Sequence, residues 1–235
     1  MEPFEQIRAI AFDADDTLWD LQSHFDDVEQ RYCQLLSDYG EAPDLSAALF
    51  ETESANMEDM GYGCKAFTIS LVENAVKVSH GQVPALTIGK IIELGKSLLR
   101  LPTTPLPEVT ETLRRLKADG RYRLAVFTKG ELLDQENKLH RSGLDRYFDL
   151  ITIVSDKTQQ AYEHLCHELE VDTPELVMVG NSFKSDIAPA LSIGAKAIHI
   201  PFHTIWQHEQ VEEYDHHNLR RILHFGEIIQ LLEKE

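Results

Sequence analysis

Short apolar runs alternate with helical patterns along the chain, and this alternation restricts its fold more than any other feature. Each run is too short for a helix and is rich in residues that favour buried strands. The four clear runs are Ile7–Phe12, Leu124–Phe127, Leu176–Val179 and Ala197–Ile200, and a fifth candidate is Leu150–Val154.

Helical patterns lie between these later runs, at residues 131–141, 158–170 and 185–193. The order of strand and helix predicts an α/β fold with a doubly wound parallel sheet, whose ligands bind at the carboxyl ends of the strands. A last segment, Leu219–Leu232, is predicted to be a helix packed on the outside.

Residues 21–103 interrupt this order because they contain no convincing strand pattern. Apolar residues recur at helical spacing over 25–39, 67–78 and 88–99, and the first two patterns stop at Gly40 and Gly81. Three prolines then follow within residues 102–107, which favours an extended connector. We therefore expect a core of residues 1–20 and 104–235 with a helical cap, residues 21–103, inserted after the first strand.

The composition limits the partners that the protein can have. A formal net charge of -18 repels nucleic acid and anionic lipid, so we expect neither as a partner. No apolar run approaches the roughly 18 residues of a membrane span, no signal peptide is recognisable, and the three cysteines lack metal-binding spacing. We expect a cytoplasmic protein whose partner is a small molecule, and the oligomeric state is not predicted.

Polar residues suited to phosphoryl chemistry follow three of the predicted strands. Asp13, Asp15 and Asp16 come directly after the first, and three carboxylates so close together need a cation or a chemical task. The segment 128–130, Thr-Lys-Gly, follows the second strand and can hold phosphate oxygens. The segment 180–186 follows a later strand and offers oxygen ligands for a hard cation.

These motifs resemble those of the haloacid dehalogenase-like (HAD) hydrolase superfamily, which consists mostly of phosphatases. That family has a DxDxT segment after its first strand, a Thr or Ser after the second, a later Lys ahead of a helix, and an acidic segment after a following strand. The matching residues here are Asp13 to Thr17, Thr128, Lys157, and Asn181 with Asp186. The match spans roughly residues 7 to 200, and the four motifs in this order are a specific signal.

The resemblance implies a catalytic role for four residues. Asp13 attacks phosphorus and forms an aspartyl-phosphate, and Asp15 protonates the leaving oxygen and later deprotonates the attacking water. Thr128 orients the phosphoryl group, and Lys157 offsets the charge of Asp13 and the phosphate. Lys129 is a further candidate for substrate binding, and Lys129 and Lys184 are possible substitutes for Lys157.

The resemblance also implies a Mg²⁺ ion. Its ligands would be the Asp13 carboxylate, the Asp15 backbone carbonyl, and the segment that contains Asn181 and Asp186. We therefore expect a Mg²⁺-dependent phosphohydrolase that acts on a small phosphorylated metabolite. An acid at Asp15 favours phosphatases and phosphomutases over dehalogenases, which have no alkoxide to protonate.

Several alternatives stay open. A phosphomutase or a dehalogenase-like hydrolase is possible within the superfamily. Asn181 replaces an aspartate common in relatives and Thr158 replaces a usual proline, which keeps open a catalytically weak binding or regulatory protein. In the cap, Tyr62 or Lys65 could contact substrate, or their loop could be a plain turn between helices. Asp16 is expected to be structural.

Overall fold

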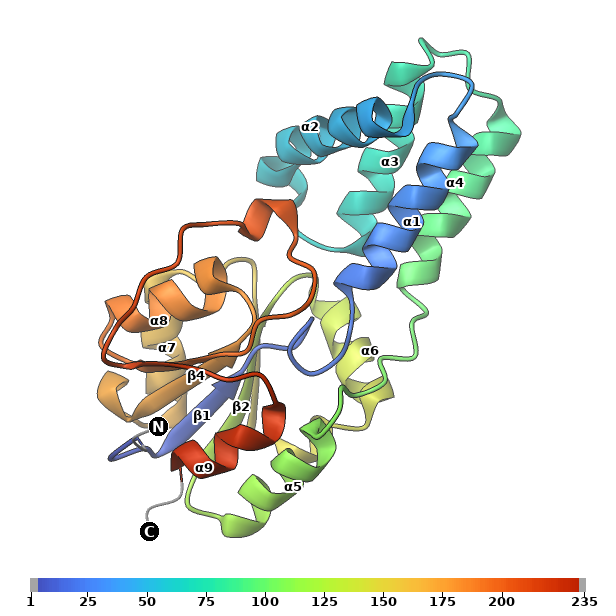
Figure 1. Ribbon diagram of the computed structural model, residues 1–235. Helices are drawn as coiled ribbons and strands as arrows, with labels where there is room; N and C mark the ends of the chain where they lie inside the picture. The colour runs from blue at the N-terminus through green and yellow to red at the C-terminus, as the bar shows by residue number, and fades with distance from the viewer. Residues whose placement is uncertain (1–3, 233–235) are drawn as a thin grey trace. The chain divides into compact units, whose positions relative to one another are not determined.

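The computed structural model describes residues 4–232 and has six parallel strands in one sheet, in the order β3-β2-β1-β4-β5-β6. The central strands β1, β2 and β4 are labelled in Figure 1. The strands are β1 (Ala9–Phe12), β2 (Arg123–Lys129), β3 (Leu150–Val154), β4 (Leu176–Gly180), β5 (Lys196–His199) and β6 (Leu219–Arg221). The strand order reverses at β1, as in a doubly wound fold. The predicted fold class is confirmed.

Helices and side chains bury both faces of the sheet. The core helices are α5 (Val109–Asp119), α6 (Leu132–Ser142), α7 (Gln159–Leu169), α8 (Ala188–Ser192) and α9 (Ile228–Leu232). Ile10 and Phe12 of β1 pack in one cluster with side chains of α5 and α9, whereas Ala9 and Ala11 pack in another with side chains of α7. Successive residues of a strand point to opposite faces, so a strand covered on both sides must be apolar throughout.

The predicted helix over Leu219–Leu232 is wrong. Its first three residues form β6, which pairs in parallel with β5, and a short turn at Phe225–Glu227 precedes the five-residue helix α9. Leu219, Ile222 and Phe225 are buried at three-residue spacing, which imitates one helical face. The free edge of β5 decides the outcome because its backbone groups need partners, and local spacing does not reveal that edge.

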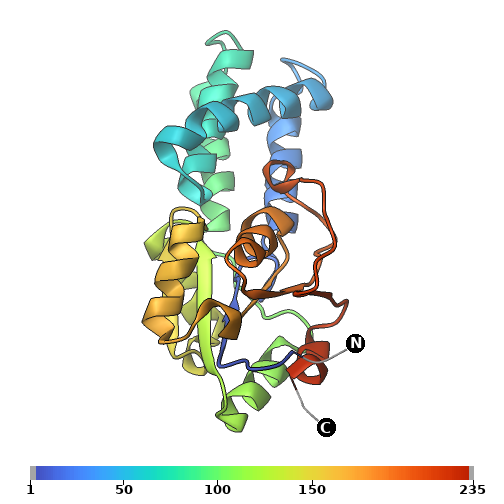
Figure 2. The same ribbon diagram turned by 90° about the vertical axis from the view of Figure 1, so that its left-hand side faces the viewer.

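The chain divides into two compact units. The core unit holds residues up to 22 together with those from 103 onward, and the helical unit holds residues 23–102. The helical unit is built from α1 (Gln22–Leu35), α2 (Ala42–Met60), α3 (Cys64–Val78) and α4 (Ala85–Leu98), which form a bundle (Figure 2). The bundle has its own cluster of buried apolar side chains. Within residues 4–232, no helix is long and apolar enough to cross a membrane.

Substitution by alanine should have opposite effects on stability at the two glycines of α4. A Cβ on Gly95 would lie 2.1 Å from Oγ1 of Thr68, which is fixed by a hydrogen bond to the Cys64 carbonyl. We expect Gly95→Ala to destabilise the protein by about 1–3 kcal/mol, because α3 and α4 must move apart.

The matched control is Gly89→Ala, where a Cβ has no atom within 4 Å. Here alanine should stabilise by about 0.5–1 kcal/mol through its higher helix propensity. Urea unfolding of both variants measures the contrast. Equal shifts in the same direction would contradict this packing of α3 on α4.

Candidate active site

The sequence motifs converge at the carboxyl edge of the sheet. Phe12 is in register with Val126 and Val179, so Asp13 and the residues after it lie beside the ends of β2 and β4. The Asp13 backbone N–H donates to the Val179 carbonyl at 2.9 Å, which fixes the start of the Asp13 loop against the end of β4.

A buried ammonium group joins two buried carboxylates at this edge. Nζ of Lys157 lies 2.5 Å from Oδ1 of Asp13 and 2.6 Å from Oδ1 of Asp186. All three side chains are less than one tenth exposed. Such short contacts between ionised groups are the strongest hydrogen bonds that side chains make.

One ammonium group does not balance two carboxylates in a low-dielectric site. Burial is the main cause that raises the pKa of Asp13 to about 7, and the charge of Asp186 adds to it against the opposing effect of Lys157. Burial alone would lower the pKa of Lys157, but the two carboxylates on it raise that pKa overall. The pair of carboxylates therefore has capacity for a further cation.

Thr17 connects Asp13 to the later acidic segment. Its Oγ1 lies 3.2 Å from Oδ2 of Asp13 and 3.1 Å from Oδ1 of Asn181, and it accepts the Asn181 backbone N–H at 3.1 Å. One carboxylate oxygen and one amide oxygen thus face the same hydroxyl group. Thr17 is buried, so these contacts are shielded from solvent.

The donor set fits a hard divalent cation such as Mg²⁺. Asp13, Asn181 and Asp186 offer only oxygen atoms, which Mg²⁺ prefers, and the excess negative charge at Asp13 favours a cation there. Both Asp186 oxygens already accept hydrogen bonds, from Lys157 and from the Ser182 backbone N–H, whereas Oδ1 of Asn181 contacts Thr17. Within residues 4–232 no three His, Cys, Asp or Glu side chains form a metal-binding group, so such a site would depend on the Asn181 amide.

The loop after β4 is shaped to bring Asp186 back to the sheet. A Cβ on Gly180 would lie 2.2 Å from Oδ2 of Asp186, so glycine is required for this approach. Ser182 accepts the Ser185 backbone N–H with its side chain and begins the π-helical turn Phe183–Ile187. Tyr162 of α7 donates to the Asp186 carbonyl at 2.8 Å.

Asp15 has partners that the sequence analysis did not identify. Lys138 and Gln135, both on α6, contact its carboxylate, and so does Nε1 of Trp19. Gln135 and Lys138 are buried, although both residue types are usually exposed. Their spacing on one helix face was the available signal, but a polar residue on an amphipathic helix is normally placed toward solvent.

Asp16 has the structural role that the sequence analysis expected. Its φ is 62°, and its Oδ1 accepts the backbone N–H groups of Leu21 and Gln22 at 2.8 Å. Burial is the main cause that raises the pKa of its carboxyl group to about 7. Asp16 therefore shapes the turn that leads into α1.

The side chains of Thr128 and Lys129 have different contacts. Thr128 is buried, and its Oγ1 lies 3.3 Å from Nε2 of Gln135. Nζ of Lys129 pairs with Glu209 and lies 2.9 Å from Oγ of Ser185. The ammonium group of Lys129 thus holds the β5–β6 loop, residues 200–218, and its role in substrate binding stays a prediction.

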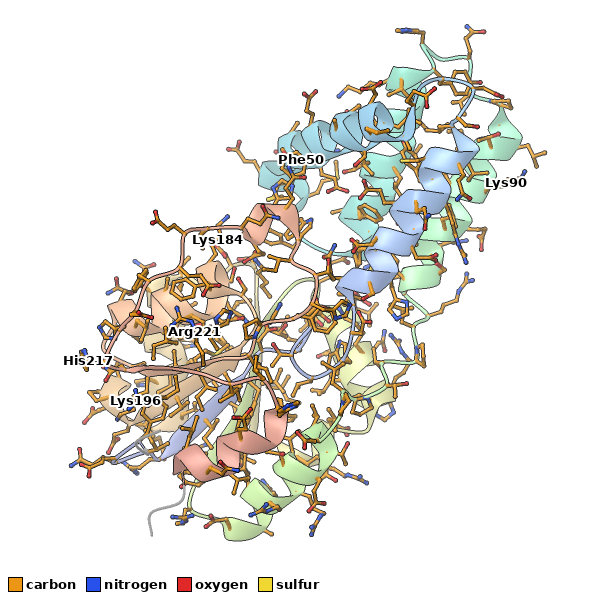
Figure 3. All side chains as sticks on the ribbon, viewed as in Figure 1. Phe50, Lys90, Lys184, Lys196, His217 and Arg221 are labelled. Atoms are coloured by element: carbon orange, nitrogen blue, oxygen red, sulfur yellow. The ribbon has the colours of Figure 1, made fainter. Side chains whose placement is uncertain are left out.

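The β5–β6 loop makes further contacts with the segment that contains Asn181. Lys184 donates to the His208 carbonyl at 2.7 Å, and Arg221 pairs with Glu213 (both basic residues are labelled in Figure 3). The buried His199 ring lies 3.0 Å from the Asn181 carbonyl through Nε2. Lys184 is thereby engaged outside the Asp13 site.

Tyr62 and Lys65 belong to the helical unit. Tyr62 lies in the turn between α2 and α3, and Lys65 is in the first turn of α3, which begins at Cys64. Contact of either residue with substrate stays a prediction.

Comparisons with known proteins agree with this geometry. The family model for haloacid dehalogenase-like hydrolase matches residues 7–194. A protein from Methanothermobacter thermautotrophicus named glyceraldehyde 3-phosphate phosphatase is 28% identical over 82% of this chain and 84% of its own length. One of the same name from Methanocaldococcus jannaschii is 27% identical over 97% of this chain and 100% of its own.

A solved structure is also similar over nearly the whole chain. It is a haloacid dehalogenase-like family hydrolase from Xanthomonas campestris, with a TM-score of 0.85 and 30% identity over 97% of this chain and 93% of that one. The family match covers most of the core unit and all of the residues assembled around Asp13. The chain therefore belongs to the haloacid dehalogenase-like hydrolase family.

Proposed function

We propose that this hydrolase is a Mg²⁺-dependent phosphatase that acts on a small phosphorylated metabolite through an aspartyl-phosphate. The observation that carries the proposal is the buried Asp13 carboxylate, paired with Lys157 and followed two residues later by a second acid. A nucleophile and a separate acid are what two-step phosphoryl transfer needs.

The proposed reaction has two half-reactions. In the first, an Asp13 oxygen bonds to phosphorus, the bond from phosphorus to the leaving oxygen breaks, and that oxygen takes a proton from the Asp15 carboxyl group. In the second, water bonds to phosphorus and gives a proton to Asp15, and the bond between Asp13 and phosphorus breaks. Lys157 keeps the nucleophile oriented through its 2.5 Å contact with Asp13.

Four groups at the carboxyl edge of the sheet would support these steps. Thr128 would orient the phosphoryl oxygens through its hydroxyl group, and Asp13, Asn181 and the Asp15 carbonyl would hold Mg²⁺, with Asp186 nearby. When bound, the ion would offset the charge of the phosphoryl oxygens. Without a cation, a phosphate dianion would meet uncompensated carboxylates at close range.

The leaving group separates this proposal from a dehalogenase-like activity. A halide leaves without a proton, so that chemistry gives no function to an acid two residues after the nucleophile. Three side chains hold the Asp15 carboxylate, so its position is fixed. The names of the two relatives support a phosphatase too, and they make glyceraldehyde 3-phosphate the first compound to test.

Release of phosphate from a panel of sugar, three-carbon and nucleotide phosphates tests the reaction. We expect Mg²⁺-dependent release from at least one compound, and a loss of at least about 10³-fold in Asp13→Asn, because an amide cannot act as the nucleophile. Glu58→Gln, an exposed change in α2, is the control and should keep full activity. If purified protein with Mg²⁺ hydrolyses none of the panel, the phosphatase proposal fails.

Asp13→Asn should also raise thermal stability. The folded state raises the pKa of Asp13 from 3.8 to about 7, so this carboxyl group stabilises the fold below pH 4, and that contribution is lost as the pH rises through 7. At pH 8 the wild type carries the full cost of the buried charge, which the amide removes. We expect Tm to rise by about 2–4 °C at pH 8 and by less at pH 5.

Thermal unfolding in EDTA at both pH values measures this difference without a metal ion. Glu58→Gln should show no such dependence on pH, since its carboxylate is exposed. A lower Tm for Asp13→Asn at pH 8 than for the wild type would contradict the described excess of negative charge.

The Asn181 amide leads to a prediction about the metal. Asn181→Asp adds a negative charge beside Asp13, where Thr17 already brings the two side chains together. The Mg²⁺ concentration for half-maximal activity should fall by about tenfold or more, since one charge at about 4 Å contributes between about 1 and 4 kcal/mol.

The rise in Tm with added Mg²⁺ gives a second measurement that does not depend on turnover. The matched control is Asn218→Asp, an amide of the same unit that contacts the Gly194 and Ala195 carbonyls instead. If Asn181→Asp leaves both the half-maximal concentration and the Tm response unchanged, Asn181 is not a ligand.

A further inference from the structure

We propose that Lys138 and Gln135 of α6, together with Trp19, are positioning residues that fix the Asp15 carboxylate for proton transfer. These three residues are called the Asp15 clamp below. The inference rests on the proposed function, because it concerns the residue assigned there as acid and base.

Both oxygens of Asp15 are bound twice. Nζ of Lys138 lies 2.8 Å from Oδ1 and 2.8 Å from Oδ2. Nε1 of Trp19 donates to Oδ1 at 2.8 Å, and Nε2 of Gln135 donates to Oδ2 at 2.8 Å. Donors on both oxygens fix the planar carboxylate in one orientation, which a single ion pair would not achieve.

The clamp contains a buried ammonium group, whose removal from water is unfavourable. The Lys138 side chain is 2% exposed, and removing an ammonium ion from water costs several kcal/mol before its partners offset that cost. Buried ion pairs of this kind add little net stability compared with apolar side chains of similar shape. A role in placing Asp15 accounts for this lysine better than a role in holding α6 against the sheet.

Gln135 links Asp15 to the last two residues of β2. Its Nε2 also donates to the Lys129 carbonyl at 2.7 Å and lies 3.3 Å from Oγ1 of Thr128. Gly130 has a φ of 139°, and a Cβ there would lie 2.9 Å from Nε2 of Gln135. The backbone after β2 is thus shaped around this amide, which ties the Asp15 carboxylate to the predicted phosphoryl-binding hydroxyl.

The other end of the clamp is fixed as well. The Lys138 backbone carbonyl accepts the Thr103 hydroxyl at 3.0 Å, and Nζ of Lys138 lies 3.7 Å from Oδ2 of Asp134. Asp134 therefore helps to hold the lysine from within α6. The exposed Glu136 of the same helix offers a matched control.

The arrangement favours one half-reaction in particular. All the clamp contacts are N–H groups that donate to the Asp15 oxygens, so they orient these oxygens as hydrogen-bond acceptors. In the proposed function, Asp15 acts as an acceptor when water attacks the aspartyl-phosphate. Loss of the clamp should therefore slow breakdown of the intermediate more than its formation from a substrate whose leaving group needs no proton.

The test compares Lys138→Met, Asp15→Asn and the double variant with 4-nitrophenyl phosphate, whose aryl oxide leaves with little help from an acid. We expect Lys138→Met to lower turnover by about 10- to 100-fold, part of the range that acid–base catalysis provides. The fraction of enzyme trapped as phosphoenzyme by rapid acid quench should rise. Lys138→Met should have no further effect on turnover in the Asp15→Asn background.

Three further variants distinguish positioning from packing. Lys138→Arg keeps the charge and should recover part of the turnover. Gln135→Leu should lower turnover and raise the phosphoenzyme fraction, and the exposed change Glu136→Gln should stay within about twofold of wild type. Gln135→Leu also serves as the test if Lys138→Met does not fold. The inference is overturned if the phosphoenzyme fraction is unchanged in a folded clamp variant, or if Lys138→Met slows Asp15→Asn as much as it slows wild type.

Urea unfolding separates this inference from the proposed function. If wild type releases phosphate from no compound, the proposed function fails by itself. The clamp is then judged by the unfolding midpoints of wild type, Lys138→Met, Asp15→Asn and the double variant. Midpoint shifts of Asp15→Asn and Lys138→Met that do not add in the double variant support the contact. Additive shifts overturn it.

Discussion

The ion pair of Lys157 with Asp13 and Asp186 is the interaction on which the carboxyl edge of the sheet depends. Asp13 extends β1, and Asp186 returns to the sheet through the loop after β4, so their carboxylates come within reach of one ammonium group. Two like charges about 4 Å apart cost about 4 kcal/mol at an effective dielectric constant of 20. Lys157 makes this convergence tolerable, and Gly180 supplies the space for it.

Residues that follow the family match in the sequence also contact the carboxyl edge of the sheet. The family match ends at residue 194, yet Glu209 of the β5–β6 loop pairs with Lys129 and accepts a hydrogen bond from Ser185 at 2.7 Å. Burial works against the charge of Glu209, but Lys129 and the serine hydroxyl groups outweigh it and lower its pKa. The loop after β4 is thus fixed on one side by the Asp13 site and on the other by Glu209.

The sequence predicted the central strands and the residues around Asp13 because both depend on local patterns. Strands buried on both faces are apolar throughout, and the DxDxT segment contains Asp13, Asp15 and Thr17 together. The sequence did not predict β6, because an edge strand is defined by its neighbour β5. The two clamp residues of α6 were missed for a related reason, since the carboxylate they bind lies over 100 residues earlier in the chain.

The two buried lysines at this edge contact different carboxylates. Lys157 lies between Asp13 and Asp186, and Lys138 lies between Asp15 and Asp134, so each ammonium group serves two carboxylates. The proposed nucleophile Asp13 and the proposed acid Asp15 therefore have separate cationic partners, although only one residue lies between them in the sequence. A shared lysine would couple the two carboxylates, so that protonation of Asp15 would also change the charge balance at Asp13. In the proposed function, separate partners would let Asp15 exchange a proton while Asp13 keeps its orientation, which is what a two-step transfer requires of neighbouring carboxylates.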